Sequence, residues 1–225
     1  MMKNRELLKS AVIKLFAGVV LLGALLFVPA GSLNWPEAWW FMGLLFVPML
    51  VAGFALLWKN PALLERRLRN RETEPVQRRV VALSGLMFVS AFVVAGLNWR
   101  FRWIVMPRWT EVVAAAVFLV GYLMYAEVMR ENEYLSRTVE VAEGQRVVDT
   151  GLYGVVRHPM YAATLLMFLS MPLVLGSPIS LAIMLAYPVL IAGRIRNEEE
   201  VLMRELPGYA EYTRKVKYRL VPGIW

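Results

Sequence analysis

The sequence contains no cysteine and only one histidine among its 225 residues. Without cysteine, the chain cannot form a disulfide framework, supply a thiolate nucleophile or hold an iron–sulfur cluster. A single histidine excludes the histidine-rich zinc and haem sites, and we expect no metal. Any chemistry must therefore depend on carboxylates, arginine, tyrosine, the one histidine (His158) or a bound organic cofactor.

Charged residues are also scarce, at 19% of the chain, whereas hydrophobic types make up 59%. An ordinary soluble domain is about 45–50% apolar and about 25% charged. The uncharged runs are long, at 38–58, 80–99 and 159–193, and a bilayer span needs about 20 apolar residues. A soluble globular fold is therefore close to excluded. We predict an all-α, polytopic integral membrane protein.

The runs predict four transmembrane helices and a C-terminal helical hairpin, about six membrane segments in all. The four helices are expected at 11–28, 36–58, 80–97 and 111–132. The run 159–193 would extend about 52 Å as one helix, too long for a single crossing. It contains Pro172, Gly176, Ser177 and Pro178 near its middle, so we predict two arms, at 160–175 and 179–193.

The basic residues predict the orientation. The formal net charge of +8 is better explained by basic loops facing an anionic cytoplasmic leaflet than by nucleic-acid binding. With both termini cytoplasmic, the outer turns hold only Arg100, Arg102 and Arg108 of the 25 basic residues. The polar segment 59–79 is then a cytoplasmic loop. An outer interfacial belt is expected from the tryptophans Trp35, Trp39, Trp40, Trp99, Trp103 and Trp109.

The densest polar motif lies just before the hairpin, from Gly151 to Tyr161. Pro159 suits the first turn of a helix, whose free N–H groups favour an anion. Arg157 adds a two-pronged cation that fits a carboxylate or phosphate. The motif therefore predicts an anion site where the loop enters the membrane, and a lipid-headgroup anchor is the alternative.

Two further clusters follow the hairpin. Arg194 and Glu198 are four residues apart, as are Arg196 and Glu200, which indicates ion pairs on a helix surface. A solvated helix end would explain this pattern, but the hairpin would also bring it to the membrane face that holds Arg157 and His158. The segment around Tyr209 and Tyr212 predicts a short amphipathic helix, used either for packing or as a pocket wall.

In this order, the clusters resemble the isoprenylcysteine carboxyl methyltransferase and phospholipid methyltransferase superfamily. That pattern is G-x-Y-x-x-x-R-H-P-x-Y, a hydrophobic hairpin, R-x-x-x-E-E and then G-x-x-Y-x-x-Y. The resemblance covers about 132–225, with Ala163 and Pro207 as mild departures. The matching residues are Gly151, Tyr153, Arg157, His158, Pro159, Tyr161, Arg194, Glu198, Glu199, Gly208, Tyr209 and Tyr212.

The resemblance implies S-adenosylmethionine as the cofactor, held at the cytoplasmic face. It implies a membrane methyltransferase core over 80–225, with the cofactor region at 131–225, preceded by a helix pair and basic loop over 1–79. Arg157 and Glu199 become the catalytic candidates. The implied cofactor-binding residues are Gly151, Tyr153, Arg157, His158, Pro159, Tyr161, Arg194, Glu198 and Glu199.

The implied reaction moves a methyl group to a lipophilic acceptor that enters from the bilayer. The resemblance implies an isoprenylcysteine-type carboxylate as the expected acceptor, and the residues themselves do not choose among acceptors. An ionised carboxylate would need orientation and no base. A phospholipid amine would need a base, with Glu199 as the candidate, and a small hydrophobic thiol is a third possibility. The rivals of another class are an NADPH-dependent sterol-type membrane reductase and a non-catalytic membrane protein.

Overall fold

The computed structural model describes residues 4–68, 75–136 and 141–225. Within these ranges the chain is helical and contains no strand, which confirms the predicted fold class. The elements in chain order are α1 (Asn4–Ala30), α2 (Pro36–Lys59), α3 (Pro61–Leu68), α4 (Pro75–Phe101), α5 (Arg108–Glu131), the 3-10 turn η1 (Gly151–Gly154), α6 (Pro159–Val174), α7 (Pro178–Met184), α8 (Tyr187–Glu205) and α9 (Tyr209–Lys215).

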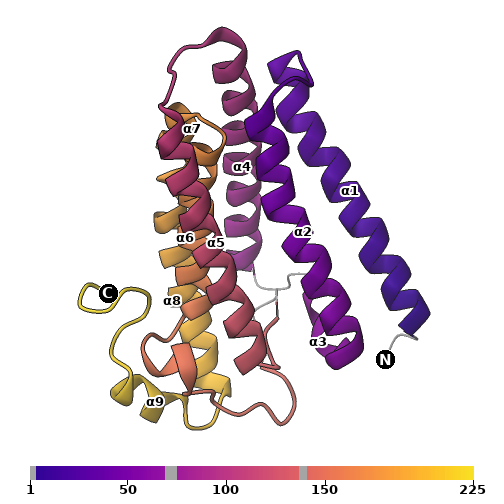
Figure 1. Ribbon diagram of the computed structural model, residues 1–225. Coiled ribbons are helices and arrows are strands. Elements are labelled where there is room, and N and C mark those ends of the chain that lie inside the picture. The colour runs from indigo at the N-terminus through magenta and orange to yellow at the C-terminus, as the bar shows by residue number, and fades with distance from the viewer. Residues whose placement is uncertain (1–3, 69–74, 137–140) are drawn as a thin grey trace.

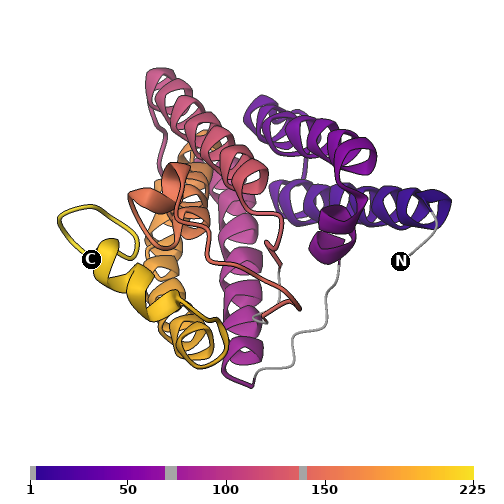
Figure 2. The same ribbon diagram turned by 90° about the horizontal axis from the view of Figure 1, so that it is seen from below.

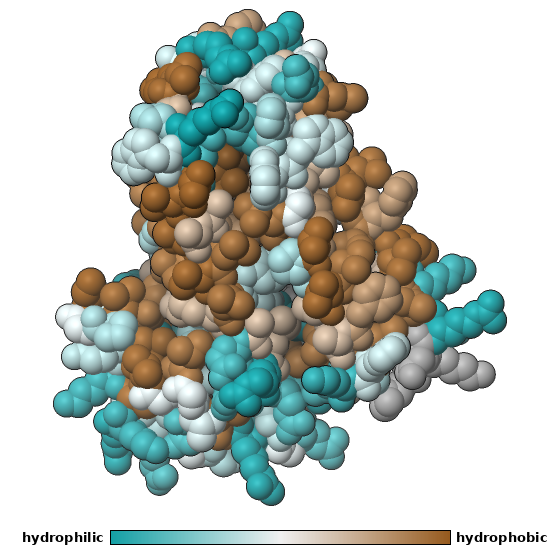
Figure 3. All heavy atoms as spheres, in the orientation of Figure 1, coloured by the Kyte–Doolittle hydropathy of each residue, from teal (hydrophilic) through white to brown (hydrophobic). Residues whose placement is uncertain are grey.

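Five helical segments of the described chain are long and apolar enough to cross a membrane: Arg5–Ala30, Pro36–Lys59, Gln77–Phe101, Arg108–Glu131 and Pro178–Glu205. They run side by side in Figure 1. Figure 3 shows hydrophobic side chains gathered in a band between two polar ends. Exposed apolar surface of this extent matches lipid rather than water, so the chain is an integral membrane protein.

The predicted hairpin is present, but its two arms are unequal. The first arm, α6, has 16 residues, or about 24 Å at 1.5 Å per residue, which is shorter than the hydrocarbon core. Gly176 turns the chain with a φ of +67°, a conformation that costs glycine little. The second arm comprises α7 and α8 and continues to Glu205, beyond the predicted end at 193. Of the six predicted membrane segments, five are long enough to cross a membrane, and the sixth, α6, is a shorter apolar helix.

One helix was missed by the sequence analysis. Within the polar segment 59–79, α3 forms a short helix at Pro61–Leu68. Asn60 caps it, because its Oδ1 accepts a hydrogen bond from the Leu63 N–H at 3.0 Å, and Pro61 occupies the first turn. The remainder of that segment, up to residue 74, lies outside the described residues.

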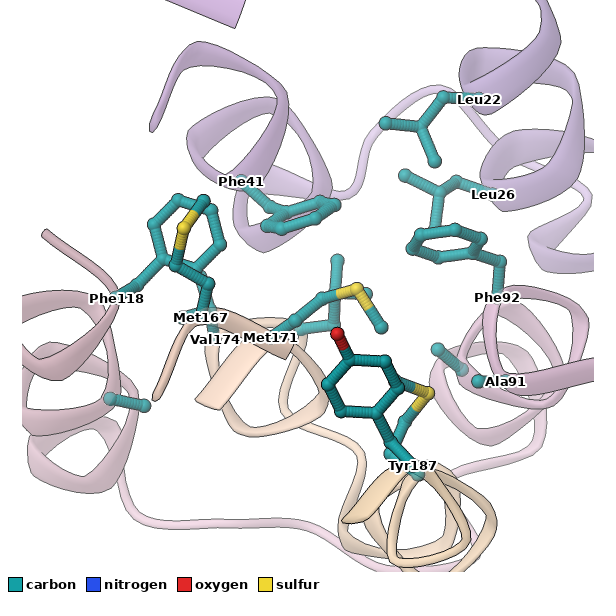
Figure 4. Close-up of a cluster of buried hydrophobic side chains, with 14 of the residues drawn as sticks. Leu22, Leu26, Phe41, Ala91, Phe92, Phe118, Met167, Met171, Val174 and Tyr187 are labelled. Carbon is teal, nitrogen blue, oxygen red and sulfur yellow. The ribbon is translucent and has the colours of Figure 1, made fainter. Parts of the chain in front are cut away.

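The apolar core joins the membrane helices through large side chains. Phe41 of α2 packs against Phe92 of α4 and Phe118 of α5, with ring centroids 6.1 and 5.8 Å apart. Figure 4 places these rings around Met171 of α6 and Tyr187 of α8. The core therefore ties the N-terminal helices to the hairpin.

Two glycines permit close helix contacts. A Cβ on Gly121 of α5 would lie 2.7 Å from Met167 and 2.9 Å from the backbone oxygen of Ala163, both on α6. A Cβ on Gly96 of α4 would lie 2.7 Å from the backbone oxygen of Leu26 on α1. Small residues at such crossings let membrane helices approach closely. The contact at Gly121 fixes α6, and with it the motif before it, against α5, and the contact at Gly96 fixes α4 against α1.

The tryptophan prediction was partly wrong. Trp35 is fully buried and stacks on Trp99, with centroids 5.8 Å apart, so this pair belongs to the core. Trp39, Trp40, Trp103 and Trp109 are exposed at the same end of the molecule. At the opposite end lie α3, η1 and α9, together with the start of α1 (Figures 1 and 2). The side of the membrane that each end faces stays a prediction.

Candidate functional site

Arg157 lies at the polar end, just before α6, and is fixed by the C-terminal segment. The backbone N–H groups of Arg157 and His158 donate to the carbonyls of Tyr218 and Arg219, both at 2.9 Å. The buried guanidinium donates through Nη1 to the carbonyls of Val216 and Lys217, at 2.8 Å each. Its Nε donates to Glu199 Oε1 at 2.7 Å. Most of its donors are therefore occupied by the protein itself.

Glu199 of α8 is the centre of this network. Its Oε1 also lies 3.2 Å from His158 Nε2, and its Oε2 accepts from Arg219 Nε at 2.7 Å. A buried carboxylate is stable only when it is paired and hydrogen-bonded, and here both oxygens are. The network locks three segments together: the entry to α6, the end of α8 and the C-terminal segment.

A second set of hydrogen-bonded polar side chains lies beside the Glu199 network. The hydroxyl of Tyr161 on α6 donates to Glu198 Oε2 at 2.5 Å and accepts from Arg194 Nε at 2.9 Å. The side chain of Glu198 is 24% exposed, whereas that of Glu199 is 11% exposed. The predicted approach of the two motifs across the hairpin is therefore present, and Glu198 is the carboxylate with open space beside it.

The turn η1 presents Tyr153 to the same region. Gly151 opens the turn with a φ of +54°, and a Cβ there would lie 3.1 Å from the side chain of Glu131. The Tyr153 hydroxyl accepts from Asn132 Nδ2 at 2.9 Å. The Tyr153 carbonyl accepts from the Tyr212 hydroxyl at 2.7 Å. Burial raises the pKa of Tyr153 to about 12, so its hydroxyl stays neutral at physiological pH.

One pocket lies at this polar end of the molecule, and six of the nine predicted site residues line it. The other three, Gly151, Pro159 and Glu199, do not line the pocket and instead support its wall. The six that line the pocket are Tyr153, Arg157, His158, Tyr161, Arg194 and Glu198.

Other residues of the pocket wall were not predicted from the sequence. Asn132 and Arg146 contribute polar groups, and Leu135, Val147 and Leu206 contribute apolar ones. The two tyrosines of α9, left open between packing and a pocket wall, line it as well. Asn132 and Arg146 belong to no sequence motif, and only Gly208 and the Tyr209-x-x-Tyr212 spacing pointed to α9.

The arginines of α3 hold part of this wall from the N-terminal side. Arg66 donates to the carbonyl of Glu133 at 2.9 Å, and Arg67 donates to that of Ser136 at 3.0 Å. Arg67 also donates to the hydroxyl of Tyr125 and stacks over its ring. Because segment 132–136 lines the pocket, the predicted basic loop contributes to the geometry of the site.

Comparison with known proteins matches one segment of the chain to a protein family. Residues 109–209 match the model of the family described as phospholipid methyltransferase. The match covers a little under half of the chain. The matched segment includes all six predicted residues that line the pocket, together with Tyr209.

Sterol reductases are also similar to this chain. The Delta(14)-sterol reductase TM7SF2 of Mus musculus is 31% identical over 91 residues, which is 39% of this chain. The Delta(14)-sterol reductase of Methylotuvimicrobium alcaliphilum is 22% identical over 135 residues, or 53% of this chain. The matches span only 22% and 32% of the lengths of these relatives. The whole-protein activity of these relatives therefore does not carry over to this chain.

Proposed function

We propose that this protein transfers a methyl group from S-adenosylmethionine to a lipophilic acceptor at the polar end of the membrane helices. The observation that carries the proposal is the overlap between the pocket and the matched family segment. Tyr161, Arg194 and Glu198 form a polar group on the pocket wall, and all three belong to residues 109–209. When bound, S-adenosylmethionine supplies an electrophilic methyl carbon on a sulfonium.

The donor set fits this cofactor. Glu198 is a partly exposed carboxylate that can accept from an ammonium or from ribose hydroxyls. Arg194 and Arg146 line the same pocket and can pair with a carboxylate. The buried hydroxyl of Tyr209 has no hydrogen-bond partner within the described residues. Apolar walls from Val147, Val201 and Leu202 suit an aromatic base.

We assign Arg157 and Glu199 a structural role instead of the catalytic role predicted for them from the sequence. The Nε and Nη1 atoms of Arg157 and both carboxylate oxygens of Glu199 are held by each other, by Arg219 and by backbone carbonyls. We therefore assign them to holding the pocket in shape, and we assign cofactor contacts to Glu198, Arg194 and the tyrosines. A positioned first shell depends on such rigid support.

An isoprenylcysteine-type carboxylate remains the acceptor that the chemistry favours. An ionised carboxylate attacks without losing a proton, so the protein has only to orient it and limit water. An amine acceptor needs a base, and Glu199 is ill suited because both of its oxygens already accept hydrogen bonds from arginine. A phospholipid amine or a small thiol would have to use Glu198 instead.

The second candidate is an NADPH-dependent sterol-type reductase. It is favoured by the likeness to Delta(14)-sterol reductases over 39% and 53% of this chain. A nicotinamide cofactor would also use arginines at the pocket, so side-chain charge alone does not separate the two functions. The family match over 109–209 favours the methyltransferase.

The test is incubation of the detergent-purified protein with methyl-labelled S-adenosylmethionine. An isoprenylcysteine analogue, a phospholipid extract and a hydrophobic thiol serve as separate acceptors. We expect label in one organic product, and we expect it to be base-labile if a carboxylate is methylated. Label in none of them, with NADPH oxidised in the presence of a sterol, would replace this proposal by the reductase.

A further inference from the structure

Tyr209 opens α9 and has a buried hydroxyl that finds no hydrogen-bond partner among the described residues. The residue is 4% exposed, and its hydroxyl oxygen makes no hydrogen bond within the described part of the chain. Leaving such a group unpaired is costly, and buried hydroxyls are usually satisfied. Its side chain lines the pocket. An unpaired polar atom at a pocket wall indicates a partner that comes from the ligand.

Tyr212, one turn further along α9, provides the comparison within the same helix. It is 5% exposed, and its ring centroid lies 5.7 Å from that of Tyr209. Its hydroxyl donates to the carbonyl of Tyr153 at 2.7 Å. Among the described residues, the buried hydroxyl of Tyr212 therefore has a hydrogen-bond partner and that of Tyr209 has none.

Packing alone does not account for the hydroxyl of Tyr209. The cluster around it consists of Leu206, Tyr212 and Val216, with Val147 and Leu202 at its edge. A phenylalanine ring would fill the same volume without burying a polar atom. Gly208 precedes the ring with a φ of +84°, which sets the direction in which α9 starts and the wall that Tyr209 faces.

We infer that the Tyr209 hydroxyl is a ligand-binding group that donates a hydrogen bond to an acceptor atom of the molecule held in this pocket. The inference rests on the proposed function, which makes that molecule S-adenosylmethionine, a ligand rich in oxygen and nitrogen acceptors. Burial, with the negative charges of Glu199 and Glu198 nearby, raises the pKa of Tyr209 above its ordinary value. The hydroxyl therefore keeps its proton and acts as a donor.

The experiment compares three single variants of the full-length protein in detergent: Tyr209→Phe, Tyr212→Phe and Tyr218→Phe. Tyr218 is 40% exposed and is not part of the pocket wall, so it serves as the matched control. Thermal unfolding without ligand is measured first, and affinity for S-adenosylhomocysteine is measured by calorimetric titration.

We expect Tyr209→Phe to unfold at or above the wild-type temperature, because it removes an unsatisfied buried group. Tyr212→Phe should unfold about 2–4 °C lower, because it leaves the Tyr153 carbonyl without its donor. Tyr209→Phe should bind S-adenosylhomocysteine about three- to tenfold more weakly. Tyr218→Phe should match the wild type in both measurements.

Two results would overturn the inference. If Tyr209→Phe lost as much thermal stability as Tyr212→Phe, its hydroxyl would have a partner inside the folded protein. If it bound S-adenosylhomocysteine as tightly as wild type, the hydroxyl would not contact the ligand. Failure of the wild type to bind S-adenosylhomocysteine would contradict the proposed function instead, and the unfolding comparison would still decide whether the hydroxyl is unpaired.

Discussion

Buried arginine in this protein acts first as a structural group. Arg157 and Arg219 both hold the carboxylate of Glu199, and Arg157 also holds two backbone carbonyls of the C-terminal segment. Removing Arg157 leaves the carboxylate of Glu199, whose side chain is only 11% exposed, without one of its charged partners. The residues that are most conspicuous in the motif thus stabilise the site, and the groups with open space beside them are the better candidates for ligand contact.

This view predicts a large loss of stability in Arg157→Ala. We expect the free energy of unfolding to fall by about 3–5 kcal/mol, because Glu199 loses one of its two arginine donors and the Val216 and Lys217 carbonyls lose their hydrogen bonds from Arg157. Denaturant titration in detergent measures the change. Arg214→Ala, at an exposed position on α9, should stay within about 0.5 kcal/mol of wild type. If Arg157→Ala were as stable as the wild type, that result would contradict a structural role for Arg157.

The motif could be found from sequence, but its internal contacts could not. The spacing of Arg157, His158 and Tyr161, followed by Arg194, Glu198 and Glu199, indicated one shared site. The hydrogen bonds from Arg157 to the carbonyls of Val216 and Lys217 span 59 and 60 residues. Backbone carbonyls have no sequence signature, so no pattern could indicate that the guanidinium was already occupied.

Tyrosine burial predicts how stability depends on pH. Burial raises the pKa of Tyr153 from 10.0 to about 12, so the folded state holds this proton more tightly than the unfolded state does. The resulting stabilisation is fully present below pH 10 and is lost as the pH rises towards 12. Unfolding measured over this range should show the loss, and Tyr153→Phe should show a smaller one. An unchanged free energy of unfolding between these pH values would contradict the prediction.

Among the elements, α3 links the N-terminal helices to the pocket. The long helices were predictable because their apolar runs exceed the bilayer thickness. The short helix α3 was not, because it is polar and basic and lies between two membrane helices. Its one local signal is the capping residue Asn60 before Pro61. Its function in the fold depends on contacts between Arg67 and residues 58 and 69 positions away.

The link through α3 predicts that Arg67→Ala loosens segment 132–136. The variant loses the hydrogen bonds to the Ser136 carbonyl and to the Tyr125 hydroxyl. We expect faster amide hydrogen exchange in 132–136 and weaker binding of S-adenosylhomocysteine. Lys59→Ala, an exposed change beside α3, is the control. Wild-type exchange in this segment would show that α3 does not hold it.

For the whole molecule, the central question is which end faces the cytoplasm. The apolar band and the polar ends follow from composition. The distribution of arginine and lysine predicts that the pocket end is cytoplasmic. Because the natural chain has no cysteine, a single introduced cysteine reports on its own position.

We expect Glu143→Cys and Glu211→Cys to react with a membrane-impermeant thiol reagent only in inverted membrane vesicles. Leu33→Cys, 68% exposed at the other end of the helices, should react only in right-side-out vesicles. Reaction of Glu143→Cys and Leu33→Cys from the same side would contradict the topology. Reaction of all three with the sides exchanged would reverse the orientation and place the pocket outside.

The most direct test of the account is calorimetric titration of the purified protein with S-adenosylhomocysteine, with NADPH in a parallel cell. We predict saturable binding of S-adenosylhomocysteine alone. Glu198→Gln should weaken it about tenfold or more, because a charged hydrogen bond is lost, while the exposed Glu200→Gln should not change it. Saturable binding of NADPH alone, or equal affinity in Glu198→Gln and wild type, would contradict the assignment of this pocket to a methyl donor.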